Sequence, residues 1–347
     1  MQTTDEIFIR RCFQLATYGG KEVMPNPMVG AIIVKDGKIL GEGFHRKYGG
    51  SHAEVDAFDS VAETDKSKLK GATMYVSLEP CSHFGKTPPC SLRIIREGIS
   101  RVVYGCTDPN PLMAGKSLTQ MEKAGIKVEG PVLNIEAKQL IVPFRKNLQK
   151  RPFIILKLVK SRDNYIGIKD RQVWLSSPAT SVLTHKWRSE VHGILVGKST
   201  VLTDNPALTT REYPGENPVR IVLDSRLEIP ASAKVLSDNI PTIIFNQFQD
   251  GKNGNKSFYK TANLHNDLEK MIHQLFEAGI YSLMVEGGAE ILKSFFNRNL
   301  WDEARVICTP HLLLEGITAP NIEGRLTDKK NIGPDTVFFI ANNRTDD

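Results

Sequence analysis

The sequence predicts two α/β domains in tandem. Its 347 residues, 40% of them hydrophobic, are enough for two or three cores of ordinary size. Apolar runs typical of strands alternate with helical patterns through both halves. A polar, basic segment, Arg145–Pro152, interrupts this alternation, and Pro152 disfavours a helical conformation at Arg151. We therefore expect one domain over residues 1–147 and a second over residues 151–347.

In the first half, the Asp36-Gly37 turn between two apolar runs predicts a β-hairpin. The later strands are separated by helices and are expected to be parallel. The expected strands are Gly30–Val34, Lys38–Gly43, Thr73–Ser77, Arg101–Gly105 and Lys127–Glu129. The expected helices are Ala53–Ala62, Ser91–Glu97 and Leu118–Lys123. Motifs should then lie at strand ends and helix starts.

The second half is a further α/β series without an internal repeat of the first. The expected strands are Phe153–Val159, Gly193–Val196, Val219–Leu223, Thr242–Phe245, Ser282–Val285 and Ala304–Cys308. The expected helices are Ala179–Ser189, Leu268–Ala278 and Ala289–Asn297. The Gly- and Asn-rich stretch Asp250–Lys256 predicts a mobile surface loop.

Composition excludes several classes of protein. The net charge of +6 is modest and its basic runs lie among acidic residues, which favours local sites for small anions over a nucleic-acid track. Apolar runs such as Met28–Val34 are far shorter than the roughly 20 residues needed to cross a bilayer. Five cysteines are a sparse, odd set that argues against a disulfide framework, and the acidic N-terminus does not resemble a secretory signal. We expect a cytoplasmic protein.

The most informative motif is His52-Ala53-Glu54, which is followed by Cys81 and, after eight intervening residues, by Cys90. Zinc binds imidazole and thiolate, and three protein ligands leave a fourth position for water, as in catalytic sites. In zinc deaminases a glutamate two residues after the histidine moves protons, which is the position of Glu54. The pattern predicts a zinc-dependent deaminase, with a longer loop between the cysteines than the usual two residues.

Plainer explanations stay open for these residues. Cys81 and Cys90 could be packing residues and His52 a surface histidine. His83, inside the loop between the cysteines, could compete as a metal ligand. The other cysteines are expected to pack in the core: Cys12, Cys106 and Cys308.

Two stretches of the second half predict a site for a phosphorylated ligand. Gly287-Gly288 lies between an apolar strand and a helix, where backbone N–H groups can approach a phosphate, although such turns also occur for structural reasons. In the run that follows strand Gly193–Val196, Asp204 presents a carboxylate and Arg211 offers a fork for phosphate. A helix cap and a solvated arginine are the structural alternatives.

The segments Pro25–Gly30, His52–Glu54 and Pro80–Cys90 together resemble the deaminase half of the bifunctional deaminase/reductase family of riboflavin biosynthesis. The resemblance implies a cytidine-deaminase-like three-layer domain with Glu54 as its catalytic residue. The implied ligands of one zinc ion per chain are His52, Cys81 and Cys90. The residues implied to contact the pyrimidine or the phosphate of the substrate are Asn26, His45 and Lys86.

The second half resembles the reductase half of the same family, at Lys157, Ser161, Asp163, Trp174, Arg188, Thr200–Arg211 and Glu286–Gly288. The implied fold is dihydrofolate-reductase-like and the implied cofactor is NADPH. Residues implied to lie along the cofactor are Lys160, Trp174, Thr200, Asp204, Gly287 and Gly288, although Trp174 could instead pack in the core. Residues implied to face the ribose phosphate are Lys157, Arg188, Leu208, Arg211 and Glu286. Lys157, Asp204 and Glu286 are candidates for orienting groups or handling protons.

This chain departs from the family pattern at two places. The family usually has Ser-Leu-Asp-Gly after the first reductase strand, where this chain has Ser161-Arg162-Asp163-Asn164. Asn tolerates left-handed backbone angles better than most residues, so the turn is expected to form. Ser117 replaces a glycine in the loop that follows Asp108.

The resemblance implies hydrolytic deamination of 2,5-diamino-6-(5-phosphoribosylamino)pyrimidin-4(3H)-one and then NADPH-dependent reduction of the ribosyl to the ribityl chain. The implied partners are this phosphorylated aminopyrimidine and NADPH, with no nucleic acid or membrane, and the implied assembly is a homo-oligomer. Two alternatives stay open. A nucleic-acid base deaminase predicts a concentrated basic groove. A structural zinc module with a nucleotide-sensing domain predicts a closed site in which His83 is a fourth ligand.

Overall fold

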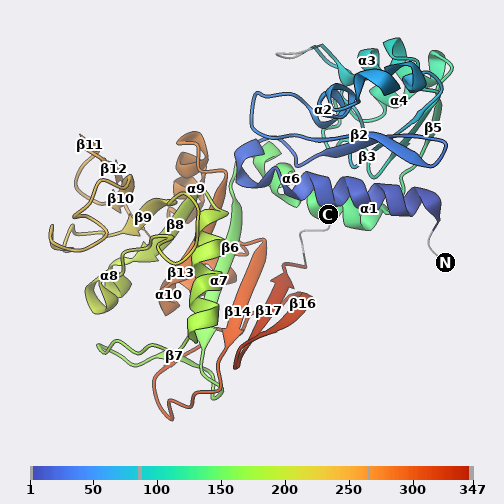
Figure 1. The fold of residues 1–347 in the computed structure, drawn as a ribbon. Coiled ribbons are helices and arrows are strands. Elements are labelled where there is room, and N and C mark those ends of the chain that lie inside the picture. The colour runs from blue at the N-terminus through green and yellow to red at the C-terminus, as the bar shows by residue number, and fades with distance from the viewer. Residues whose placement is uncertain (1–2, 85–87, 265, 344–347) are drawn as a thin grey trace. The chain divides into compact units, whose positions relative to one another are not determined.

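The computed structural model describes residues 3–84, 88–264 and 266–343, and the chain forms two units, Met1–Gln149 and Lys150–Asp347 (Figure 1). Each unit has helices on both faces of a sheet, so both are α/β as the sequence predicts. Among the helices of the described residues, none combines the length and the apolar character that crossing a bilayer requires.

The sheet of the first unit has the strand order β2-β1-β3-β4-β5. Its strands are β1 (Gly30–Lys35), β2 (Lys38–Phe44), β3 (Thr73–Val76), β4 (Arg101–Tyr104) and β5 (Lys127–Glu129). The expected hairpin is confirmed, because β1 and β2 are antiparallel and Asp36 and Gly37 take the positive φ angles of a tight turn, 50° and 75°. Strand β3 is parallel to β4 and β4 to β5, also as predicted.

Helices cover both faces of this sheet. They are α1 (Thr4–Thr17), α2 (Ala53–Asp59), α3 (Cys90–Arg96), α4 (Lys116–Lys123), α5 (Asn134–Leu140) and α6 (Val142–Leu148), with 3-10 turns at Gly20–Val23 and Glu63–Leu69. Alternate residues of β1 point to opposite layers: Ile32 packs with Ile9 of α1, and Ile33 packs with Phe58 of α2 and Ile94 of α3. This is the three-layer arrangement expected for the first domain.

The sheet of the second unit has the order β11-β12-β10-β9-β8-β13-β6-β14-β17-β16, and β15 pairs separately with β7. Its strands are β6 (Phe153–Lys160), β7 (Tyr165–Gly167), β8 (Gly193–Gly197), β9 (Val219–Leu223), β10 (Thr242–Asn246), β11 (Gly251–Asn253), β12 (Lys256–Lys260), β13 (Ser282–Gly287), β14 (Glu303–Cys308), β15 (Ile317–Thr318), β16 (Arg325–Ile332) and β17 (Asp335–Ala341). From β12 to β14 neighbouring strands run parallel.

The central strand β6 again divides two apolar layers. Ile154 and Leu156 pack in the layer with α9 (Leu268–Glu277) and α10 (Ala289–Asn297). Ile155 packs in the opposite layer, which contains Trp187 of α7 (Pro178–Ser189) and Val201 of α8 (Lys198–Asp204). Figure 1 shows α7 in front of the sheet, running alongside β6.

Two expectations about local structure are wrong. The stretch Asp250–Lys256 is not a plain loop, because β11 and the start of β12 pair there as a hairpin with Gly254 at a φ of 60°. The basic segment from Arg145 does not interrupt the helical pattern at once, because α6 continues to Leu148 and buries Lys146 and Asn147. In both places a regular element forms from a polar segment that has no apolar periodicity to predict it.

At Gly30 the backbone of α1 lies directly against the sheet. A Cβ atom at this position would lie 2.1 Å from the carbonyl oxygen of Cys12 and 2.8 Å from the amide nitrogen of Ala16. Both neighbours are backbone atoms of α1, so neither can move without moving the helix. Gly167 in β7 is a contrasting strand glycine, because a Cβ there would meet no atom within 4 Å.

We therefore predict that Gly30→Ala destabilises the first unit by about 1–3 kcal/mol, the usual cost of overpacking. Gly167→Ala, the matched control, should change the free energy of unfolding by less than about 0.5 kcal/mol, as most uncrowded substitutions do. Urea denaturation of both variants measures the difference. Equal stability of Gly30→Ala and the unmodified chain would show that α1 does not pack on β1 this closely.

Candidate active sites

Three potential metal ligands converge in the first unit, and they are the three that the sequence predicts. The side chains of His52, Cys81 and Cys90 place one ligand atom each within 4.8 Å of one another. His52 Nδ1 lies 3.4 Å from Cys81 Sγ and 3.3 Å from Cys90 Sγ. In the part of the chain that the structure describes, no other group of three or more His, Cys, Asp or Glu side chains converges in this way.

Strand ends and helix starts bring these ligands together. His52 is the N-cap residue of α2, Cys81 follows β3, and Cys90 is the first residue of α3, as the sequence predicts. The Cys90 amide also donates to Cys81 Sγ at 3.3 Å. Hydrogen bonds from Cys90 and His52 lower the pKa of the Cys81 thiol and so favour the thiolate that binds metals.

The donor set fits zinc. Zinc–sulfur bonds of about 2.3 Å and zinc–nitrogen bonds of about 2.0 Å, at tetrahedral angles, separate ligand atoms by roughly 3.5 Å. The measured separations of 3.3 and 3.4 Å are close to this value. His83, the alternative ligand, is exposed and does not join the cluster. Three protein ligands are the pattern of a catalytic zinc site, whereas a structural site has four.

Glu54 lies beside this cluster, in the first turn of α2. Its side chain is buried, and burial raises the pKa of its carboxyl to about 7. The carboxyl also interacts with the Cys90 thiol. A carboxyl group with a pKa near neutrality can both accept and release a proton, which suits general acid–base catalysis.

The expected pyrimidine contacts Asn26 and His45 lie next to each other. His45 Nδ1 donates to the carbonyl oxygen of Ser51 at 2.8 Å, and Asn26 Nδ2 lies 3.1 Å from His45 Nε2. Burial lowers the pKa of His45, so the neutral ring accepts from Asn26 through Nε2. The His45 ring packs edge-on against that of His52, with centroids 5.6 Å apart. Lys86, the third expected contact, lies outside the described residues.

Glu79 is a residue of this site that sequence reasoning missed. Its buried carboxylate accepts from the amides of Asp108 and Gly115, at 3.2 and 3.0 Å, and from the Ser117 hydroxyl at 2.8 Å. It thereby joins the end of β3, which carries Cys81, to the loop before α4. The only sequence signal was an acidic residue directly before Pro80-Cys81 at the end of an apolar strand.

In the second unit, three of the predicted residues form a buried charged cluster. Arg188 on α7 makes two hydrogen bonds to the Glu286 carboxylate, at 2.7 and 2.8 Å, and Lys157 Nζ on β6 lies 3.8 Å from Glu286 Oε2. Burial opposes ionisation of Glu286, but Arg188 and Lys157 outweigh it and hold its pKa at about 2. Burial lowers the pKa of Lys157 against the attraction of Glu286.

The Gly287–Gly288 turn is formed where β13 meets α10. Gly287 has a φ of 139°, which side chains rarely allow, and Gly288 is the N-cap residue of α10. The Gly288 amide donates to the Thr200 hydroxyl at 2.9 Å, and a Cβ at Gly288 would lie 3.3 Å from that oxygen. Three predicted cofactor contacts, Thr200, Gly287 and Gly288, therefore lie next to one another.

The remaining predicted residues lie in different environments. Asp204 ends α8, and Arg211, half exposed, lies 3.4 Å from Glu212. Leu208 has a φ of 54° and its side chain is buried with Trp187 and Val201, so only its backbone can face a ligand. Trp174 is 66% exposed, which excludes the alternative that it packs in the core. Lys160 Nζ contacts Asn164 Oδ1 at 2.9 Å.

Comparisons with known proteins match both units. Residues 2–106 match the cytidine and deoxycytidylate deaminase zinc-binding region, and residues 152–331 match the RibD C-terminal domain. The chain is 40% identical to riboflavin biosynthesis protein RibD of Aquifex aeolicus, over 97% of this chain and 98% of that protein. It is 36% identical to the same protein of Escherichia coli, over 97% and 99%.

A solved structure matches the fold over nearly the whole chain. It is the diaminohydroxyphosphoribosylaminopyrimidine deaminase/5-amino-6-(5-phosphoribosylamino)uracil reductase of Thermotoga maritima, with a TM-score of 0.87, 32% identity and coverage of 97% of this chain and 98% of that one. Neither a nucleic-acid deaminase nor a structural zinc module is favoured by such full-length matches. With both sites present and both halves matched, the chain belongs to the RibD family of riboflavin biosynthesis proteins.

Proposed function

We propose that this chain catalyses two successive steps of riboflavin biosynthesis, a deamination in the first unit and a reduction in the second. The observation that carries the proposal is the convergence of His52, Cys81 and Cys90 beside the buried Glu54. The proposed substrate is the phosphoribosylamino-diaminopyrimidinone, and its deaminated product is the substrate of the reductase. The Thermotoga maritima relative carries both activities in its name.

In the deaminase, zinc bound by His52, Cys81 and Cys90 would activate water as a nucleophile at neutral pH. Glu54 is the group that moves protons. It takes a proton as the water oxygen bonds to the amino-bearing carbon and gives a proton to the departing nitrogen. The carbon–nitrogen bond then breaks and ammonia leaves. Burial raises the pKa of the Glu54 carboxyl, which makes this group a better proton acceptor than an exposed carboxylate.

Asn26 and His45 orient the pyrimidine in this proposal. The Nδ1–H of His45 is occupied by the carbonyl of Ser51, which fixes its tautomer and leaves Nε2 and the Asn26 amide facing each other. Because His45 Nε2 already accepts one N–H of Asn26, the second N–H and the Oδ1 of Asn26 are the groups left to recognise a donor and an acceptor on the edge of a pyrimidine. Lys86 is proposed to bind the substrate phosphate as a point charge.

In the reductase, NADPH supplies the hydride. Lys160, Trp174, Thr200, Asp204, Gly287 and Gly288 are proposed to hold the cofactor. Lys157, Arg188, Leu208, Arg211 and Glu286 are proposed to hold the substrate. Reduction of the ribosyl carbon attached to nitrogen would open the bond from that carbon to the ring oxygen, and this oxygen would take a proton. Lys157 is the candidate donor, because burial lowers the pKa of its ammonium and eases proton release.

We also propose that the protein acts in the cytoplasm as a homo-oligomer. None of the five cysteines forms a disulfide, which suits a reducing compartment. Fractionation of cells followed by size-exclusion chromatography with light scattering tests both statements.

The deaminase assignment predicts that Glu54→Gln lowers ammonia release from the aminopyrimidine by about 100-fold or more, the usual contribution of a positioned acid–base group. Zinc content should be unchanged, because Glu54 is not a ligand, and reduction of the supplied deaminated intermediate should be unaffected. Ammonia release, metal analysis and NADPH oxidation measure the three quantities on one preparation. Deamination by Glu54→Gln at the original rate would contradict the proposed mechanism.

The reductase assignment predicts that Asp204→Ala raises the KM for NADPH and that Arg211→Ala raises the KM for the phosphorylated substrate, each by about tenfold, as loss of a charged hydrogen bond does. Arg298→Ala, which removes an exposed arginine at the end of α10, is the matched control and should change neither KM. Steady-state NADPH oxidation gives both constants. If either variant behaves like Arg298→Ala, its residue does not bind the ligand assigned to it.

A further inference from the structure

The segment that joins α8 to β9 carries Asp204 and Arg211 in a backbone conformation that requires support. Asn205 and Leu208 have positive φ angles of 41° and 54°. Such angles are uncommon for residues other than glycine and persist only where the surroundings hold them. The Leu208 side chain is fixed by the core, so the question is what fixes the two ends.

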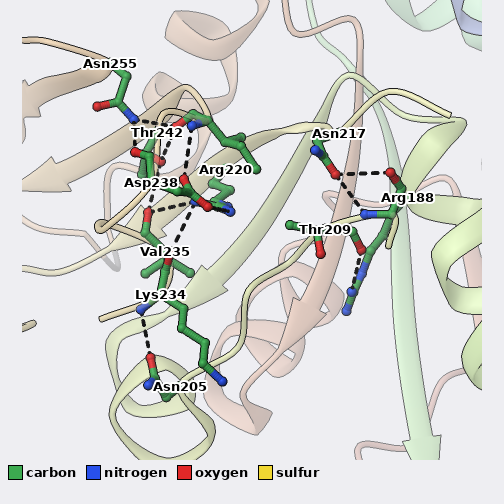
Figure 2. Close-up of polar contacts among 12 residues, drawn as sticks. Arg188, Asn205, Thr209, Asn217, Arg220, Lys234, Val235, Asp238, Thr242 and Asn255 are labelled. Atoms are coloured by element: carbon green, nitrogen blue, oxygen red, sulfur yellow. Dashed lines mark hydrogen bonds and ion pairs between the residues drawn. The ribbon is translucent and has the colours of Figure 1, made fainter. Parts of the chain in front are cut away.

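The first end is held by Asn205. Its Oδ1 accepts the backbone N–H of Lys234 at 2.9 Å (Figure 2). Its own backbone N–H donates to the carbonyl oxygen of Val201 and ends α8. Lys234 belongs to the long connection between β9 and β10. The position of Asp204 therefore depends on the position of this connection.

That connection is fixed by a buried arginine. The side chain of Arg220 on β9 is completely buried and forms two hydrogen bonds with the Asp238 carboxylate, at 2.7 and 2.6 Å. Its Nη1 also donates to the carbonyl oxygen of Val235 at 3.2 Å, and the Thr242 hydroxyl donates to the same oxygen at 3.1 Å (Figure 2). Charge-assisted, paired hydrogen bonds are strong and geometrically specific, so the sheet sets where the Lys234 amide lies.

The second end is held by Asn217. Its Oδ1 accepts from the amide and the hydroxyl of Thr210, at 2.8 and 3.1 Å. Arg188 adds a hydrogen bond to the carbonyl oxygen of Thr209 at 3.0 Å (Figure 2). Arg211 is the next residue along the chain, so its backbone position depends on this contact.

We propose that Asn205 and Asn217 are positioning residues of the reductase. Asn205, aligned by the Arg220–Asp238 pair, holds Asp204 toward NADPH, and Asn217 holds Arg211 toward the substrate phosphate. The proposal rests on the proposed function, because it takes the ligands of Asp204 and Arg211 from there. It adds that the two ends are held independently, so that each asparagine affects one ligand.

Two variants at exposed asparagines test the proposal without removing a buried side chain. Asn205→Gly removes the acceptor and keeps the positive φ angle, which glycine adopts without cost. Asn217→Ala removes the other acceptor. Asn331→Ala is the control, because it removes an asparagine acceptor of similar geometry, 3.1 Å from the Thr336 hydroxyl, in the β16–β17 hairpin. Deamination by the same chains reports whether the first unit is intact.

We expect Asn205→Gly to raise the Kd and KM for NADPH by about two- to fivefold and to leave the substrate KM unchanged, the size expected for one lost hydrogen bond. Asn217→Ala should raise the substrate KM by a similar factor and leave the Kd and KM for NADPH unchanged. Fluorescence titration with NADPH gives the Kd directly. Hydrogen exchange of the chain without ligands should become faster over residues 204–208 in the first variant and over 209–212 in the second.

The outcomes separate this inference from the function beneath it. If Asp204→Ala and Arg211→Ala leave both KM values unchanged, the assignment of the ligands is wrong. If those variants act as expected but the asparagine variants match Asn331→Ala, or raise both KM values equally, the positioning role is wrong. The proposal is supported if each asparagine variant weakens binding of one ligand only and speeds hydrogen exchange only in its own segment.

Discussion

Both units depend on one constraint: each sheet is covered by helices on both faces, so that strand side chains alternate between two apolar layers. Within β1, Ile32 and Ile33 belong to different layers, and within β6, Ile154 and Ile155 do the same. A strand interior of this kind has no place for an unpaired polar group. Reactive side chains therefore gather at strand ends and helix starts: Cys81 follows β3, His52 and Cys90 begin α2 and α3, and the glycine turn ends β13. Figure 1 shows both sheets with their helices.

The charged cluster of the reductase is an exception, because it places charged side chains within strands that are covered on both faces. Lys157 and Glu286 lie on the neighbouring strands β6 and β13, and a charge buried there is stable only when it is paired and hydrogen-bonded. Arg188 supplies that pairing from α7 with two hydrogen bonds to Glu286. Two cations against one anion leave the cluster with a net positive charge. Such a site favours an anionic ligand, which agrees with a phosphorylated substrate.

The parts of the fold and of the sites that could be predicted are those encoded by short motifs or by fixed spacings between residues. The Asp36-Gly37 turn and the spacing of the metal ligands depend on residue types at fixed positions, and both predictions are confirmed. The edge strand β16 was missed because it is almost wholly exposed and has no apolar alternation to detect. The contact between Arg188 and Glu286 joins residues far apart in the sequence, so spacing could not place it. Leu208 was assigned to the substrate site by resemblance. Its side chain instead packs in the core with Trp187 and Val201, a tertiary contact that the local sequence does not reveal.

The departures from the family pattern are accommodated by local physics. Asn164 takes a φ of 70°, the left-handed angle that glycine would supply and that Asn tolerates. The side chain of Arg162 is exposed, so it does not displace the core. Ser117 does more than replace a glycine, because its hydroxyl is one of three donors to the buried carboxylate of Glu79. A glycine at this position would leave that carboxylate with two amide donors. The serine therefore strengthens the connection between the segment after β3, which carries Cys81, and the first turn of α4.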